Sequence, residues 1–378
     1  MRIAPFGVEQ WMNEYETRCA YNLAETCVES LTIGALLELA AGPDGQGDPG
    51  DLLEQLLPMQ LTYGAIEGSD RLRAAVAALY EQQGIANVLI AHGAIGANHL
   101  VHLTLVEPGD RVVSVLPTYQ QHYSIPESIG ADVRILRLRE ENAWLPDLDE
   151  LRDHVSGGAK LVAINNPNNP TGSLMDRAML EKIVAICAEA GAWLLCDEVY
   201  RGIDQHGGGT TASIADLYDR GISTGSMSKA FSLAGLRLGW AVGQTELMHE
   251  LTVHRDYNTI SVGMVDDLLA AIALESADAV LERSRSITRT NLATLAAWVD
   301  QQPHISWIKP LSGTTALLKH DLPMTSRELC VDLVESTGVM LTPGSVLGME
   351  GYLRIGYANS PEILSEGLRV FGDWLAQR

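Results

Sequence analysis

The chain has 378 residues, of which 46% are hydrophobic and 20% are charged, so it can build a substantial core and is not a disordered chain. Its formal net charge of -22 at pH 7 argues against nucleic acid or an anionic membrane as the main partner. The five cysteines are irregularly spaced and form no CxxC pair, which argues against a disulfide framework and favours a reducing compartment. No segment contains the roughly 20 apolar residues of a membrane span, and the start of the chain lacks a signal-peptide run. We therefore expect a cytoplasmic protein.

Short apolar runs alternate with longer helical patterns after a linker-like, glycine-rich stretch at residues 41–50. Spaced apolar faces predict helices at Arg71–Gln82, Ala97–Val106, Asp147–Val155 and Arg177–Ala190. The apolar runs predict buried strands at Val112–Leu116, Leu161–Ile164, Trp193–Cys196 and Trp240–Val242. This alternation predicts an α/β fold with a mostly parallel sheet that helices cover on both faces.

A glycine turn follows the apolar run 88–91 and opens a helical pattern. Its sequence is His92-Gly-Ala-Ile-Gly-Ala97. Such a turn at a helix N-terminus gathers free N–H groups that can surround a phosphate. The alternative is a plain strand-to-helix turn.

A carboxylate ends one of the predicted strands. Asp197 directly follows the apolar residues 193–196, with Tyr200 close behind. The C-terminal end of such a strand faces the crevice where α/β folds bind ligands. A lone aspartate there can also be a helix cap or an ion-pair partner. Asn169, in Asn169-Pro-Thr-Gly172, stands in a segment that forms a turn in any case.

Lys229 stands in the most informative stretch of the chain. Ser226 and Ser228 precede it, and Arg237 follows eight positions later. Hydroxyls and a guanidinium together can hold a dianionic phosphate. Burial would lower the pKa of the lysine and keep part of the amine neutral. The alternative for a lysine taken alone is a surface position.

Two other motif interpretations fail. Ser226-Met-Ser-Lys229 also spells the S-x-x-K of penicillin-binding proteins and class A β-lactamases, but the accompanying S-D-N and K-T-G strings do not occur. His249 and His254 stand five positions apart, a spacing that turns two side chains away from each other on a helix. We therefore expect no metal site.

Taken in order, Asn169, Asp197, Lys229 and Arg237 resemble the signature of the class I/II aminotransferases, which are pyridoxal 5'-phosphate (PLP) enzymes of fold type I. The resemblance implies that Lys229 forms an imine with PLP and then moves protons of the substrate. It implies that Asp197 keeps the ring nitrogen protonated. It also implies that Tyr200 and Asn169 donate hydrogen bonds to the ring oxygen.

The same resemblance implies further contacts. Tyr119 would stack on the cofactor ring, and Arg354 would clamp the α-carboxylate of an amino acid substrate, together with Asn169. Tyr63 would reach the phosphate of the partner subunit in a homodimer with shared active sites. The phosphate would be cradled by the backbone at Gly93, Ala94 and Ile95 and by Ser226, Ser228 and Arg237.

For the fold, the resemblance implies a large domain with the parallel sheet and a smaller α+β domain. Ala279–Asp300 predicts a long helix that crosses between them. We expect an N-terminal segment, residues 1–45, that packs on the small domain, a large PLP-binding domain at 46–285, and a small domain at 286–378.

Shorter similarities concern the reaction. Val8–Trp11 and Arg255–Ser261 resemble a branch that includes capreomycidine synthase, and Asn22-Leu-Ala-Glu25 is similar to a segment of ACC synthases. Both catalyse elimination and cyclisation, and the latter similarity places Glu25 toward the substrate. We therefore predict an aminotransferase-like PLP enzyme that acts on an L-α-amino acid in specialised, natural-product metabolism. The alternatives are a β/γ-elimination lyase or cyclase, and a PLP-binding regulator domain, for which the chain leaves no room for a DNA-binding N-terminal domain.

Overall fold

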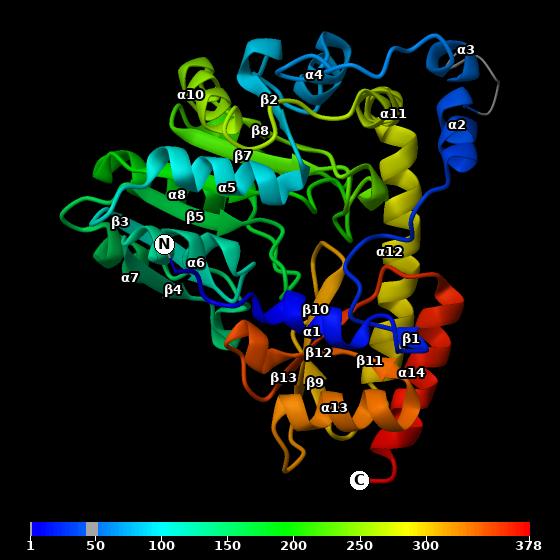
Figure 1. Ribbon diagram of the computed structural model, residues 1–378. Coiled ribbons are helices and arrows are strands. Elements are labelled where there is room, and N and C mark those ends of the chain that lie inside the picture. Colours follow the sequence, from blue (N-terminus) through cyan, green and yellow to red (C-terminus); the bar gives the residue numbers. More distant parts are fainter. Residues whose placement is uncertain (1, 43–51) are drawn as a thin grey trace.

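The computed structural model describes residues 2–42 and 52–378, and in this part of the chain the largest sheet has seven strands (Figure 1). The strand order is β2-β8-β7-β6-β5-β3-β4; β8 is antiparallel to both neighbours and the other pairs are parallel. The mostly parallel α/β sheet expected from the sequence is thus confirmed. The strands are β2 (Val88–Ala91), β3 (Arg111–Leu116), β4 (Asp132–Arg137), β5 (Leu161–Asn165), β6 (Trp193–Asp197), β7 (Gly221–Ser226) and β8 (Gly239–Val242).

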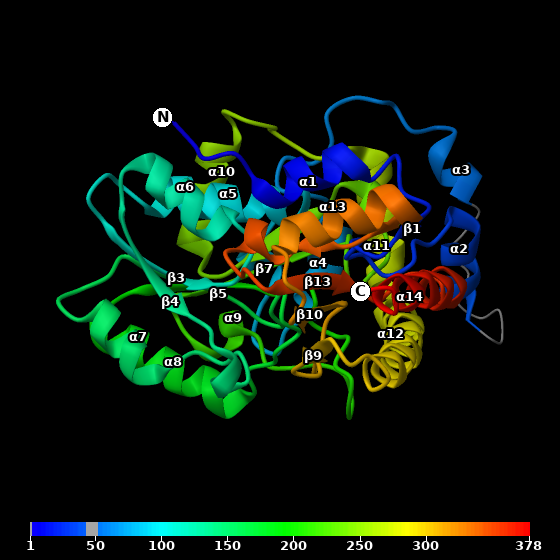
Figure 2. The same cartoon turned by 90° about the horizontal axis from the view of Figure 1, so that it is seen from below.

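Helices cover both faces of this sheet (Figure 2). Because successive side chains of a strand point to opposite faces, Val112 packs toward one layer of helices and Val113 toward the other. None of the described helices is both long and apolar enough to cross a membrane. One layer consists of α5 (Gly93–Leu105), α6 (Gln121–Ile129) and α10 (Thr245–Arg255), and the other of α7 (Leu148–Val155), α8 (Arg177–Ala190) and α9 (Ile214–Leu217).

Two of the four predicted helices differ from the observed ones by more than one residue at an end. The helix α5 begins at Gly93 instead of Ala97, because Gly93 takes the left-handed conformation that starts it, with φ 67°. The helix α4 (Asp70–Ala77) ends five residues before the predicted Gln82. The backbone N–H groups of Glu81 and Gln82 bind the carboxylate of Asp216 instead of continuing the helix.

A smaller α+β unit follows the long helix α12 (Ala277–Val299). Its antiparallel sheet has the order β12-β13-β10-β9, and α13 (Ser326–Thr337) and α14 (Pro361–Leu375) pack on it. The strands are β9 (Ile305–Trp307), β10 (Thr315–His320), β12 (Thr342–Pro343) and β13 (Tyr352–Gly356).

The N-terminal segment packs on this smaller unit. The strand β1 (Tyr21–Asn22) pairs with β11 (Val339–Met340), and Trp11 of α1 (Gly7–Tyr15) donates its Nε1–H to the Leu341 carbonyl at 2.8 Å. These contacts agree with the predicted division into 1–45, 46–285 and 286–378, which stays a prediction. The boundary at residue 45 and most of the linker-like stretch 41–50 lie outside the described residues.

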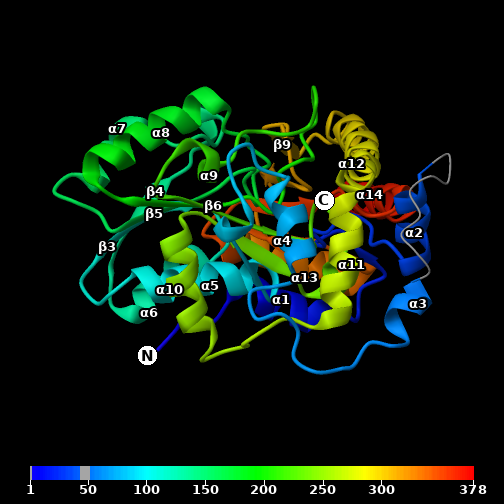
Figure 3. The ribbon, with the colours of Figure 1, turned by 90° about the horizontal axis from the view of Figure 1, so that it is seen from above.

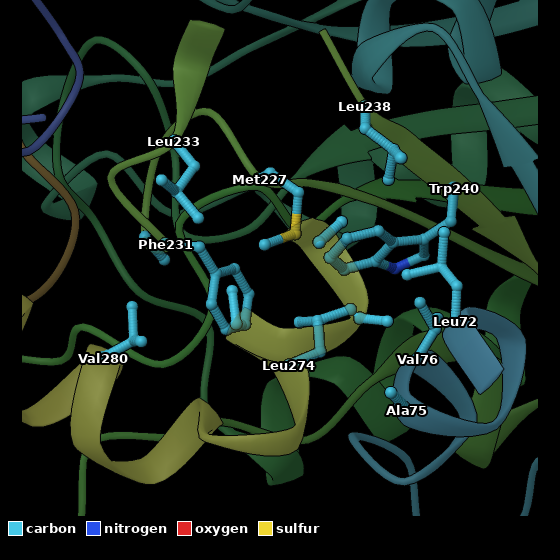
Figure 4. Packing of buried hydrophobic residues seen from close by; sticks show 14 of the residues in the cluster. Leu72, Ala75, Val76, Met227, Phe231, Leu233, Leu238, Trp240, Leu274 and Val280 are labelled. Atoms are coloured by element: carbon cyan, nitrogen blue, oxygen red, sulfur yellow. The ribbon is translucent and has the colours of Figure 1, made fainter. Parts of the chain in front are cut away.

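The helix α11 (Met264–Glu275) lies between α4 and α2 (Ile33–Ala41), and both α11 and α2 contact α12; the short helix α3 (Leu52–Leu56) lies farther from α12 (Figure 3). Between them and the sheet, Met227 and Phe231 pack against Trp240 of β8 and Leu274 of α11 (Figure 4). Gly225 leaves room for this packing, because a Cβ atom there would lie 2.6 Å from the Trp240 indole. The segment that follows β7 is therefore anchored in this cluster by Met227 and Phe231.

One glycine joins the N-terminal segment to the smaller unit. The N–H of Gly356, at the end of β13, donates to the Leu23 carbonyl at 2.7 Å, and a Cβ atom would lie 1.7 Å from the Glu25 carbonyl oxygen. We expect Gly356→Ala to lower the free energy of unfolding by about 3 kcal/mol, because two backbones must separate. Denaturant unfolding followed by circular dichroism measures this. Gly34→Ala, in an open helical position, is the control and should be neutral or stabilising; equal effects of the two would contradict the expectation.

Candidate active site

A cavity of about 470 Å³ opens at the carboxyl ends of β5, β6 and β7, where α/β folds bind ligands. The N-terminal segment and β13 complete its wall. Of the predicted site residues, Tyr63 alone lies outside this cavity, and its side chain is exposed. The structure brings together Glu25, Gly93, Ala94, Ile95, Tyr119, Asn169, Asp197, Tyr200, Ser226, Ser228, Lys229, Arg237 and Arg354.

Lys229 reaches into the cavity from the segment after β7. Its Nζ donates to Thr26 Oγ1 at 2.6 Å and to Cys27 Sγ at 3.4 Å. Burial acts to lower the pKa of the amine, but the neighbouring Cys27, Tyr200 and Glu25 outweigh it and raise the pKa. The net lowering of this pKa expected from the sequence is therefore wrong: burial acts in that direction, but three neighbours that only the fold brings to the amine act more strongly against it.

Asp197 is buried at the end of β6. Its Oδ2 accepts a hydrogen bond from Asn98 Nδ2 at 2.9 Å, and its Oδ1 accepts one from the Val199 N–H at 3.2 Å. His122 Nε2 lies 3.5 Å from Oδ2. Sequence reasoning missed Asn98 and His122. The sequence does contain a signal for Asn98. It stands five residues after Gly93, within the first two turns of the helix that begins at the glycine turn.

The glycine turn and Arg237 form an anion cradle at one end of the cavity. A Cβ atom on Gly93 would lie 3.4 Å from the Arg237 guanidinium, and the guanidinium is 3.5 Å from Ser228 Oγ. Gly239 of β8 packs directly against the backbone of the glycine turn, since a Cβ atom on Gly239 would lie 2.5 Å from the Ala94 nitrogen. The N-terminus of the 13-residue α5, a guanidinium and two serine hydroxyls thus converge, which is the donor set that a dianionic phosphate requires.

Two polar groups in the cavity are buried without a hydrogen bond of normal geometry. Tyr200 Oη lies near Thr26 but is not bonded to it, and Arg354 Nε has no acceptor. Burial raises the pKa of the Tyr200 phenol, partly offset by Lys229 and Arg354, so the phenol keeps its proton. Tyr200 can therefore donate to an acceptor in the cavity, as the phenolic oxygen of PLP would be.

Arg354 is buried, and no carboxylate among the described residues forms an ion pair with it. Its Nη1 donates to Asn169 Oδ1 at 3.3 Å, and its Nη2 donates to the Ala24 carbonyl and to Thr342 Oγ1, each at 3.1 Å. Burial lowers the pKa of this guanidinium. A substrate carboxylate would supply the missing counter-charge.

Three glutamates also line the cavity. Glu9 and Glu16 come from α1 and its end, and Glu25 comes from the segment after β1. Partial burial and the charges of Glu25 and Glu9 raise the pKa of Glu16. Glu25 differs: burial acts to raise its pKa, but Lys229 and the N–H groups of Cys27 and Thr26 lower it. Sequence reasoning found Glu25 alone, although the spacing of Glu9 and Glu16 places both on one face of a helix.

Tyr119 links the helix α1 to the cavity. Its Oη donates to Glu9 Oε1 at 3.1 Å, and its ring lies 4.7 Å from the Phe6 ring, between centroids. Gln120, the next residue, accepts from the Gly7 N–H at 2.8 Å. The stacking of Tyr119 on a cofactor ring stays a prediction, but its position at the cavity is confirmed.

Comparisons with known proteins agree with this site. The model of the family "Aminotransferase class I and II" matches residues 55–370. Capreomycidine synthase of Streptomyces vinaceus is 32% identical over 369 residues, covering 97% of this chain and 93% of that protein. A PLP-dependent aminotransferase from Streptococcus suis 89-1591 is 40% identical, covers 100% of this chain and 99% of its own, and superposes with a TM-score of 0.95. The PLP-dependent cyclase OrfR superposes with a TM-score of 0.90 at 26% identity, covering 100% and 98%.

The cradle predicts how PLP affinity depends on Arg237. We expect Arg237→Met to raise the dissociation constant of PLP at least about tenfold, because a charge-assisted hydrogen bond is lost at the phosphate. Fluorescence titration of the cofactor-free protein with PLP measures this. Arg134→Met, on the exposed edge strand β4, is the matched control and should bind PLP as the unaltered protein does. An Arg237→Met variant with unchanged affinity would place the phosphate elsewhere.

Proposed function

The chain belongs to the class I and II aminotransferases, and we propose that this PLP-dependent enzyme acts on an L-α-amino acid whose side chain is cationic. The observation that carries the proposal is the convergence of Lys229, Asp197 and the anion cradle in one cavity, with Arg354 and the three glutamates on its remaining walls. When bound, PLP supplies the electron sink that makes a proton at the substrate Cα removable.

The residues of the chain then have separate tasks. Lys229 would hold the aldehyde of PLP and, once displaced by the substrate amine, would take the Cα proton. The carboxylate of Asp197 would hold the proton of the ring nitrogen, and Tyr200 and Asn169 would donate toward the ring oxygen. Tyr119 would stack on the ring. The phosphate would be held by Gly93, Ala94, Ile95, Ser226, Ser228 and Arg237.

Substrate orientation follows from the charges of the cavity. Arg354 takes the α-carboxylate, because its guanidinium is buried without a counter-ion. Glu25 lines the same cavity, together with Glu9 and Glu16. A substrate side chain that carries positive charge would be attracted by these carboxylates, whereas an apolar side chain would gain nothing from them.

A second candidate reaction is elimination with cyclisation instead of transamination. Capreomycidine synthase and the cyclase OrfR are among the similar proteins. Either reaction begins with removal of the Cα proton by Lys229. A role in natural-product biosynthesis is part of this proposal.

We propose a homodimer in the cytoplasm as the working form. Several large apolar side chains are exposed on the side of the chain that carries Tyr63, among them Leu57 at 81% and Leu61 at 85%. A second subunit would cover such a surface. All five cysteines are unpaired thiols, as a reducing compartment maintains them.

The first prediction concerns Lys229. Borohydride treatment of the PLP-loaded protein should attach the cofactor to Lys229 irreversibly, as peptide mass spectrometry detects. Lys229→Ala should retain PLP affinity through the cradle and lose turnover. The form of the cofactor after one turnover with an amino acid distinguishes the reactions: pyridoxamine phosphate indicates transamination, and recovered PLP indicates elimination. A protein that takes up no PLP would refute the proposed function.

The second prediction concerns the glutamates. L-arginine and L-citrulline have nearly the same shape, but only arginine is cationic. We expect arginine to bind at least about tenfold tighter in spectral titrations of the loaded enzyme, because buried or partly buried charge pairs are worth more than about 1 kcal/mol. Glu16→Gln should reduce the ratio. Glu14→Gln, on the same helix but outside the cavity, is the control. Equal binding of the two amino acids would exclude a cationic preference.

The third prediction concerns assembly. If Tyr63 completes the partner's site, mixing Lys229→Ala and Tyr63→Ala proteins should restore partial activity, because one site of each mixed dimer is intact. Sedimentation and activity of the mixture measure this. A fully active monomer, or no recovery after demonstrated subunit exchange, would count against the shared site.

A further inference from the structure

The helix α5 contacts both ends of the cavity described above. Its first residue, Gly93, lies at the anion cradle, and Asn98, five residues later, lies at Asp197. Along a helix axis this spacing corresponds to about 7.5 Å. One rigid element thus spans from the phosphate cradle to the acid proposed for the ring nitrogen.

The amide of Asn98 is fully buried, and both of its ends are engaged. Its Nδ2 donates to Asp197 Oδ2 at 2.9 Å, and its Oδ1 accepts from Thr224 Oγ1 at 2.7 Å. A carboxylate can accept but not donate, so Asn98 must turn its NH₂ toward Asp197. The hydroxyl of Thr224 then donates to the amide oxygen and holds the amide in this orientation.

Thr224 is placed for this contact by the sheet. In the parallel register of β6 and β7, Thr224 is the direct partner of Asp197. Both residues are buried, and Asn98 approaches them from the helix layer. Among the described residues, Asn98 is the one side chain that donates a hydrogen bond to the Asp197 carboxylate, since His122 Nε2 stays at 3.5 Å and makes none.

We propose that Asn98 is a positioning residue for Asp197: oriented by Thr224, it fixes the carboxylate at a set distance from the phosphate cradle. The inference rests on the proposed function, because it assigns Asp197 to the ring nitrogen of PLP. The Asn98 amide holds one carboxylate oxygen, and the Val199 N–H binds the other. Without Asn98, the carboxylate loses its side-chain donor and is free to rotate away from the ring.

The test uses PLP labelled with ¹⁵N in its ring and the nearly isosteric variants Asn98→Leu and Thr224→Val. We expect the ¹⁵N resonance of the bound cofactor to show a protonated ring nitrogen in the unaltered protein. It should move toward the unprotonated position in Asn98→Leu, and less far in Thr224→Val. The PLP dissociation constant should rise about tenfold in Asn98→Leu, as for a lost hydrogen bond to a charged group.

Two further variants separate positioning from structural support. Thr224→Ser keeps the hydroxyl and should restore the resonance relative to Thr224→Val. Thr104→Val removes a hydroxyl on the same helix that has no hydrogen-bond partner, and should leave the resonance and the affinity unchanged. A role in stability alone would lower the melting temperature of Asn98→Leu without moving the resonance.

The proposal is overturned if folded Asn98→Leu binds PLP within twofold of the unaltered protein and its resonance stays in place. If Asn98→Leu does not fold, the proposal is overturned instead by a folded Thr224→Val whose ¹⁵N resonance does not move. A chain that binds no PLP at all contradicts the proposed function itself, so the two failures are distinguishable.

Discussion

Three charged side chains, those of Asp197, Lys229 and Arg354, line one cavity. The rest of the structure depends on the contacts that reduce the free-energy cost of placing these charges there. Asp197 and Arg354 are buried, and Lys229 lines the same cavity. A buried charge costs several kcal/mol unless it is paired and hydrogen-bonded. The groups that reduce this cost come from separate parts of the chain. The N-terminal segment supplies Thr26, Cys27 and Glu25, the helix α5 supplies Asn98, and the small sheet supplies Thr342. The cavity is therefore complete only when the N-terminal segment and both sheets have docked.

Much of the central sheet could be predicted because its strands are buried on both faces. β3, β5 and β6 read as continuous apolar runs, and the polar residues that follow them meet at one edge because parallel strands end together. β4 and β7 escaped prediction for different reasons. β4 is an edge strand whose exposed Asp132 and Arg137 interrupt the pattern. β7 has the sequence Gly-Ile-Ser-Thr-Gly-Ser and is buried by its neighbours, not by its own hydrophobicity.

In the site, too, features with a pattern in the sequence could be predicted, and features that only the fold creates could not. The order of Asn169, Asp197, Lys229 and Arg237 in the sequence predicted that they meet, and the structure places all four on the wall of one cavity. The direction of the Lys229 pKa shift could not be foreseen, because Thr26 and Cys27 lie about two hundred positions away and only the fold brings them to the amine. The unpaired Tyr200 Oη and Arg354 Nε likewise have no signature in the sequence. They keep donors available to a ligand without first breaking bonds inside the protein, which is how a fixed polar site gains affinity.

The close contact between Gly356 and the backbone at Glu25 has an evolutionary consequence. The N-terminal segment is attached mainly by contacts outside the cavity, through Gly356, the pairing of β1 with β11 and the buried Trp11. Exchange of Glu16 or Glu25 therefore alters the wall of the cavity while these contacts stay in place, whereas exchange of Glu9 also removes its hydrogen bond with Tyr119. Few mutations, confined to a short stretch at one end of the gene, can redirect such an enzyme to a new amino acid, because Asp197 and Arg237 are encoded far away and remain untouched.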